Sequence, residues 1–210
     1  MCGTGFAQCG VCSYSLSGGC QKTPHVFPVT LYRKDYEMKI TYIYLQLYRL
    51  FDNSTPLPAD CGELCRRACC RGDDCGMYLF PGEESVYRLL NPDWCSTETS
   101  DFTYEYGGKT KHVPILFCRG ECDRYQRPLA CRIFPLTPYV GSDGRLEIII
   151  DPRAKSVCPL STELKLEQFD KKFINNRKKT FILLMKNAEI KEYMNKYSEY
   201  IDEYKGFFKE

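Results

Sequence analysis

Cysteine is the residue whose number and spacing most clearly indicate chemistry in this 210-residue chain. Ten of its 14 cysteines lie between Cys61 and Cys158, and they begin with the run CGELCRRACC. In a helical interpretation this run places three thiols on one face, at Cys61, Cys65 and Cys69, because a helix has about 3.6 residues per turn. Gly72 would then end the helix. Thiolates are metal ligands, and a structural disulfide would not need three of them in line, so the run predicts a metal site.

The rest of the coordination must come from cysteines further along the chain. Together with the run they give eight predicted ligands: Cys61, Cys65, Cys69, Cys70, Cys118, Cys122, Cys131 and Cys158. On a helix Cys70 is turned by about 100° from Cys69, so the two do not easily join one tetrahedron. Either the helix ends at Cys69, or Cys70 serves a second metal or stays a free thiol. Eight thiolates would fill two four-thiolate sites, and we predict at least one.

Two blocks of sequence carry a resemblance to a known family. The run Cys61–Cys70 is followed by GMYLFPGEE at residues 76–84, and a second block reads CRGECDRYQRPLACRIFP at residues 118–135. Over residues 40–160 the chain resembles the YkgJ-type cysteine-cluster family, described as zinc- or iron-chelating proteins and named for a CxxCxxCC motif. The second block matches the family pattern at Cys118, Cys122, Tyr125, Arg127, Pro128, Cys131, Arg132, Phe134 and Pro135. The first block departs from the family's name, because its gaps hold three residues and not two. The resemblance implies metal binding and no particular reaction.

The sequence leaves the identity of the metal open between two alternatives. All-sulfur tetrahedral sites suit zinc and iron–sulfur clusters alike, and spacing does not choose between them. Histidine, the common co-ligand of structural zinc, occurs only at His25 and His112, which narrowly favours the iron–sulfur cluster. Arginines flank the thiolates at Arg66, Arg67, Arg71, Arg119, Arg124, Arg127 and Arg132. They either form a solvated basic face or offset the charge of a thiolate site, and for Arg127 and Arg132 the family pattern favours a place behind the ligands.

Composition argues against several partners. The 29 Lys and Arg residues are interleaved with 27 Asp and Glu residues, so no basic footprint for nucleic acid is present. The apolar segment at residues 40–51 is too short and interrupted to span a membrane. The first twenty residues carry neither a basic start nor a continuous apolar stretch, so we expect no secretion signal and a cytoplasmic protein with reduced thiols. A secreted disulfide-bonded protein is the alternative.

Two classes of function remain. The first is a cytoplasmic metal-binding protein whose thiolates hold zinc or an iron–sulfur cluster for structural, storage or electron-transfer use, the last with a protein redox partner. The second is a metal-dependent enzyme related to flagellin lysine-N-methylases, which are similar, larger proteins with a comparable cysteine cluster. The chain is short for that role and shows no glycine-rich S-adenosylmethionine loop. We therefore rank the enzyme second, and the sequence leaves open whether this protein catalyses a reaction.

Some chemically capable residues lie outside the two blocks. Cys75 is near enough to the cysteine run to serve as an alternate ligand, whereas Cys95, beside the only tryptophan, is expected to be a small buried hydrophobe. The acidic pairs at residues 73–74 and 83–84 have no partner that marks acid–base chemistry. We expect them to be solvated loop charges.

The elements that must position the cysteines indicate an α+β fold. Apolar residues at helical spacing predict a helix over Ile40–Phe51. A turn at Gly141–Gly144 predicts a β-hairpin between Leu136 and Asp151. The hairpin would carry Cys131 and Cys158 back toward the same place.

Helices are predicted for the last fifty residues. One is expected from a Thr162 cap to Ile174, a second contains Phe181–Met185, and a third has an apolar stripe at Ile190, Tyr193, Met194, Tyr197, Ile201 and Tyr204. The stripe is expected to face a core or a partner.

The predicted organisation has three parts. Residues 1–37 form a cysteine-containing N-terminal extension that is poorly structured or arises from a misplaced translation start. Residues 38–160 form the cysteine-cluster metal-binding domain, and residues 161–210 form a C-terminal helical segment that packs on it. The predicted fold is a small, irregular, cysteine-rich core organised by metal, with a short β-hairpin and a helical N-terminal entry. Such a core is expected to rely on metal for part of its stability.

Overall fold

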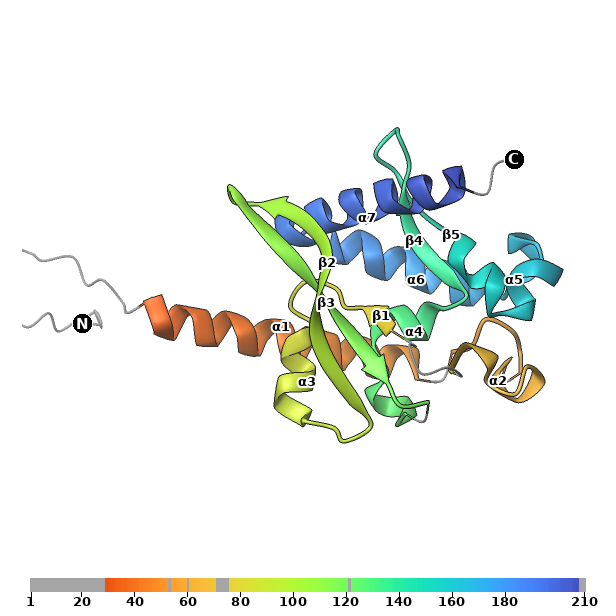
Figure 1. Ribbon diagram of the computed structural model, residues 1–210, viewed down its shortest axis with the longest axis horizontal. Helices are drawn as coiled ribbons and strands as arrows, with labels where there is room; N and C mark the ends of the chain where they lie inside the picture. The colour runs from red at the N-terminus through yellow and green to blue at the C-terminus, as the bar shows by residue number, and fades with distance from the viewer. Residues whose placement is uncertain (1–28, 53, 60, 71–75, 121, 208–210) are drawn as a thin grey trace, which may run out of the picture.

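The computed structural model describes residues 29–52, 54–59, 61–70, 76–120 and 122–207, with side chains from residue 35 onward. It is an α+β fold in which helices surround two small antiparallel sheets (Figure 1). The predicted roles of residues 1–28 and of Gly72, Cys75 and the acidic pair at 73–74 lie outside the described residues.

The helix predicted over residues 40–51 is confirmed and begins earlier. Helix α1 spans Val29–Phe51, and it buries Ile40, Tyr44, Tyr48 and Phe51 on one face. The predicted boundary between residues 37 and 38 therefore falls inside a helix. In Figure 1 the first half of α1 extends away from the other elements, whereas its second half packs against α3, which spans Glu84–Leu90.

The single helix predicted over the cysteine run is wrong. Helix α2 covers only Cys61–Leu64, and the 3₁₀-helix η1 covers Ala68–Cys70. Between them Arg66 and Arg67 have φ angles of 52° and 56°, which a continuous right-handed helix does not allow. Neither short helix buries a residue, so no apolar face holds the run in one helix.

The larger sheet contains a long hairpin that the sequence analysis did not predict. Strand β2 spans Cys95–Tyr106 and pairs with β3, Lys109–Cys118, which also pairs with the short strand β1, Gly76–Tyr78. Gly107 and Gly108 connect the two long strands with positive φ angles of 61° and 71°. Two consecutive positive φ values are typical of a type I′ turn, which suits the twist of a two-stranded hairpin.

The second sheet is the hairpin predicted after Cys131. Its strands are β4, Leu136–Val140, and β5, Leu146–Ile150, paired in register from Leu136 opposite Ile150 to Val140 opposite Leu146. The helix α4, Leu129–Ile133, carries Cys131 directly before β4, and Cys158 follows β5. This confirms that the hairpin connects the two cysteines.

Short helices connect these elements to the C-terminal region. They are η2 at Arg124–Gln126, η3 at Pro152–Ser156, α5 at Pro159–Glu163 and η4 at Leu166–Gln168. The helix predicted from Thr162 to Ile174 is wrong, because α5 ends at Glu163 and Asp170 caps a new helix, α6, over Lys171–Leu184. The predicted segment Phe181–Met185 is the last turn of α6. Helix α7, Ala188–Gly206, buries the predicted stripe except Tyr204, which is half-buried.

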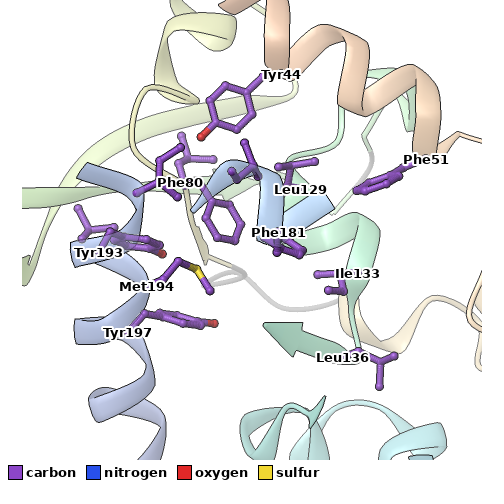
Figure 2. Close-up of a cluster of buried hydrophobic side chains, with 14 of the residues drawn as sticks. Tyr44, Phe51, Phe80, Leu129, Ile133, Leu136, Phe181, Tyr193, Met194 and Tyr197 are labelled. Atoms are coloured by element: carbon purple, nitrogen blue, oxygen red, sulfur yellow. The ribbon is translucent and has the colours of Figure 1, made fainter. Parts of the chain in front are cut away.

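The hydrophobic core is a single cluster that joins the C-terminal helices to the rest of the chain. Figure 2 shows Tyr44 of α1, Leu129 of α4, Phe181 of α6 and Tyr193 of α7 converging on Phe80. The Phe80 ring lies 5.2 Å from that of Phe181 and 5.5 Å from that of Tyr193. Within the described residues, no helix is long and apolar enough to cross a lipid bilayer.

Candidate metal centre

Most of the predicted ligands line one cavity of about 290 Å³. Those that do so are Cys61, Cys65, Cys69, Cys70, Cys122, Cys131 and Cys158. They come from separate places in the chain: the run in α2 and η1, the loop before η2, helix α4, and the residue that precedes α5. The fold therefore gathers thiols that are up to about a hundred residues apart in sequence.

Cys118 is the predicted ligand that does not line the cavity. It is the last residue of β3, and its charge helps raise the pKa of Cys131, so it lies within electrostatic reach of the other thiols. Across the sheet it stands opposite Cys95 of β2. Cys95 was expected to be buried. It packs against the core but is only half-buried.

The run brings two neighbouring sulfurs together. The Sγ atoms of Cys69 and Cys70 are 3.9 Å apart, at the end of the 3₁₀ turn. The expectation that these side chains point apart depended on a continuous α-helix, which the run does not form. Cys69 and Cys70 can therefore belong to the same site.

The sulfurs are nevertheless spread out along the cavity wall. No three thiol, imidazole or carboxylate groups of the described residues stand close enough together to hold a metal ion. The donor types fit zinc or an iron–sulfur cluster, since both take thiolate ligands. Their spacing does not fit as it stands, so ligation requires the segments around the cavity to move closer together.

Several thiols of the cavity have altered acidity. The hydrogen bond with Cys69 lowers the pKa of Cys70 to about 6, with a further contribution from the positive charges of Arg127 and Arg67. The same hydrogen bond, together with burial, raises the pKa of Cys69. Burial also raises the pKa of Cys131, and the neighbouring thiols add to the rise. The hydrogen bond thus makes one thiol of the pair easier to ionise and the other harder, as expected of two coupled titratable groups.

Arginine contacts the thiols directly. Nε of Arg127 donates a hydrogen bond to Sγ of Cys122 at 3.0 Å. Burial acts to lower the pKa of Arg127, but this bond and the charges of Cys70 and Cys131 raise it above its ordinary value. Arg67 and Arg124 also line the cavity. Arg66, Arg67 and Arg119 are exposed, as the solvated basic face predicts, whereas Arg127 is half-buried and bonded to a predicted ligand, Cys122.

Arg132 acts by holding the elements around the cavity in place. Its guanidinium donates to the carbonyl oxygens of Tyr48, Arg127 and Arg124 and to the Asp52 carboxylate. It also lies 4.6 Å from the centre of the Tyr48 ring. This buried side chain thus connects the end of α1, helix η2 and helix α4. Cys122 lies in the loop before η2, and Cys131 lies in α4.

Glu83 is a second structural connection, and the expectation that it is a solvated loop charge is wrong. It is fully buried, and its carboxylate accepts hydrogen bonds from Tyr48 Oη at 2.6 Å, Leu129 N at 2.7 Å and Phe80 N at 3.0 Å. Burial raises the pKa of Glu83 to about 7, although all three bonds act against the rise. Its bond to Leu129 satisfies the first turn of α4, which carries Cys131. The feature of the sequence that could have indicated its burial is the position of Glu83 in the block GMYLFPGEE, which carries the family resemblance.

Arg177 adds an unbalanced positive charge behind the cavity wall. It is fully buried between the rings of Phe51 and Phe173, at 3.6 Å and 4.1 Å from their centres, and it donates to Ser54. Its Nε has no hydrogen-bond partner among the described residues. Burial and, to a smaller extent, the charge of Arg132 together lower its pKa to about 9. Phe51 and Ser54 both line the cavity, so this guanidinium lies one layer behind it.

Comparisons with protein family models, curated proteins and solved structures find no match to this chain. The resemblance to the YkgJ-type family therefore stays a prediction. The geometry of the cavity carries the functional argument.

Proposed function

We propose that the cavity binds an iron–sulfur cluster or a zinc ion through cysteine thiolates. The observation that carries the proposal is the convergence of seven predicted ligands on one cavity, beside an arginine bonded to Cys122. Hydrophobic packing alone does not account for this arrangement, because most of these thiols are only half-buried and Cys69 is exposed. Thiols gathered from distant segments are typical of a metal centre.

The charges around the cavity support a negatively charged occupant. Four arginines line it, at Arg67, Arg124, Arg127 and Arg132, and the described lining includes no carboxylate. Four thiolates around a divalent ion leave a net negative charge, which Arg67, Arg124 and Arg127 would offset, while the charge of Arg132 is already paired with Asp52. Arg177 adds another positive charge behind the wall.

The spread of the thiols favours a cluster over a single ion. A zinc ion holds its sulfur ligands at about 2.3 Å, so a zinc site would require the cavity wall to close around it. An iron–sulfur cluster brings several atoms of its own and would need less closure of the cavity wall.

The biological role follows as part of the proposal. The protein would be a cytoplasmic member of the YkgJ-type cysteine-cluster proteins, with its metal centre in structural or electron-transfer use. Reduced thiols of that compartment are available to a metal. An electron-transfer role would require a protein redox partner that docks near the cavity.

Anaerobic purification from cells supplied with both iron and zinc tests the proposal. Elemental analysis, acid-labile sulfide and the visible spectrum are measured on the full-length protein. We expect iron and sulfide in stoichiometric amounts and a coloured protein. A colourless protein with stoichiometric zinc and no labile sulfide replaces the cluster with a zinc site, and a protein with neither metal contradicts the proposal.

A further inference from the structure

Two cysteines stand directly opposite each other at the end of the larger sheet. Cys95 is the first residue of β2 and Cys118 is the last residue of β3, and the strand register pairs them. Directly opposed residues of an antiparallel pair point to the same face of the sheet. The ladder is regular here, because its irregularity lies further along, between Thr99 and Thr103.

The hydrogen bonds show which kind of pair this is. The amide of Arg119 donates to the carbonyl of Trp94 at 3.1 Å, so the bonds flank Cys95 and Cys118 and do not join them. In such a non-hydrogen-bonded pair the Cα atoms are about 4.5 Å apart and the side chains are at their closest. Disulfides form at Cα separations of about 4.4 to 6.8 Å. The backbone therefore already has the spacing that a disulfide requires.

The other close pair of sulfurs does not share this advantage. Cys69 and Cys70 are in contact, but neighbouring residues have Cα atoms about 3.8 Å apart, below the range that disulfides adopt. We infer that Cys95 and Cys118 form a thiol pair that a peroxide oxidises to a disulfide.

The chemistry balances with hydrogen peroxide as the two-electron oxidant. One thiol, as its thiolate, attacks a peroxide oxygen, the O–O bond breaks, and a sulfenic acid and one water result. The second thiol attacks the sulfenic sulfur, so that the S–S bond forms, the S–O bond breaks and a second water leaves. The two sulfurs together lose two electrons and two protons, and the peroxide is reduced to two waters.

This disulfide would regulate the metal centre, a consequence that rests on the proposed function. Cys118 is the predicted ligand outside the cavity lining, so it would join the centre only as the surrounding segments move closer together, and a sulfur bonded to Cys95 is no longer a thiolate. Oxidation would therefore withdraw a ligand from the centre, and a bound metal would protect Cys118 from oxidation. Burial raises the pKa of Cys95 to about 11, and the charges of Cys118 and Cys122 add to the rise, so the pair is within electrostatic reach of the loop that carries Cys122.

Peptide mapping tests the thiol pair without any metal. Full-length protein stripped of metal is treated with hydrogen peroxide, digested without reduction and analysed by mass spectrometry. We expect a Cys95–Cys118 linkage as the main product, lost in Cys95→Ser and retained in the matched control Cys65→Ser. Linkage of Cys118 to Cys122 or Cys75, or Cys118 without any linkage, overturns the inference.

The same measurement on metal-loaded protein tests the regulation. Slower formation of the linkage than in stripped protein supports it, whereas an unchanged rate on loaded protein overturns it. A protein that binds no metal but still forms the linkage contradicts the proposed function and leaves the thiol pair standing. The thiol pair and the proposed metal site are therefore contradicted by different results.

Discussion

At the scale of single residues, two neighbouring arginines of the second block do different jobs. Arg127 bonds to a sulfur, Sγ of Cys122, and so acts on the charge of the site. Arg132 bonds to three backbone carbonyl oxygens and to Asp52, and so acts on the positions of the elements. The planar fork of a guanidinium suits both tasks, but only the first bears directly on a thiolate.

The cavity lining ranks the cysteines as ligands. We expect Cys65→Ala, Cys69→Ala, Cys122→Ala and Cys131→Ala to lower the metal content strongly, because each removes a thiol that lines the cavity. Cys95→Ala, Cys9→Ala and Cys12→Ala are the controls and should keep the wild-type content. Elemental analysis of each anaerobic preparation measures the effect. Loss of metal in Cys95→Ala with full content in Cys131→Ala would reverse the assignment.

Glu83 gives the folded protein a dependence on pH. Its pKa is about 7 in the folded state against an ordinary 4.5, so between these values the folded state holds a proton that the unfolded chain has released. The free energy of unfolding should therefore fall as pH rises from 4.5 to 7, by roughly 3 kcal/mol in total. Urea unfolding at several pH values measures this slope. Glu83→Gln should lack it, and the same slope in both proteins would be evidence against the assignment.

At the scale of elements, the helix predictions that succeeded were those with a buried apolar stripe. Ile40, Tyr44 and Tyr48 in α1, and Tyr193 and Met194 in α7, recur at helical spacing and are buried. The repeated cysteines of the run have the same helical spacing but no buried face, and the chain there breaks at two residues of positive φ. Helical spacing of the cysteines, without a buried face, was therefore not enough to form a continuous helix.

The missed hairpin shows another limit of the sequence. Thr, Tyr and Phe in β2 and the two glycines at 107 and 108 are signals of a hairpin, but charged residues interrupt the alternation. The candidate ligands could be named from their spacing and family resemblance. Their convergence, the pairing of Cys95 with Cys118 and the burial of Glu83 depend on contacts between distant segments, which local patterns do not encode.

Gly120 brings the loop of the second block against the run. Its φ is 88°, and a Cβ there would lie 3.4 Å from the carbonyl oxygen of Cys70. Gly120→Ala should cost about 1 to 2 kcal/mol of backbone strain in the loop that carries Cys122, and relief of that strain would move the loop relative to the run, so the metal content should fall. Gly144→Ala is the matched control, because its φ is 76° but nothing lies near its Cβ. Equal metal loss in both variants would refute a specific role for Gly120.

At the scale of the whole molecule, the core and the metal centre are largely separate. The buried cluster runs from α1 through α4 and α6 to α7, and of the cavity cysteines only Cys158 is itself buried. No residue of α2 or η1 is buried, and this segment forms part of the cavity wall. We therefore expect a metal to organise only the segments around the cavity, and not the whole middle of the chain.

Removing the metal should loosen the cavity segments and leave the core folded. The rings of Phe80, Phe181, Tyr193 and Tyr197 pack on one another with no contribution from the cavity thiols, so their near-ultraviolet circular dichroism should survive chelation. Limited proteolysis should instead become faster within residues 61–70, because neither α2 nor η1 buries a residue in the core. The thermal transition of the core measured by calorimetry should keep its cooperativity. Loss of the aromatic signal together with the metal would mean that the cysteine centre and the core fold as one unit.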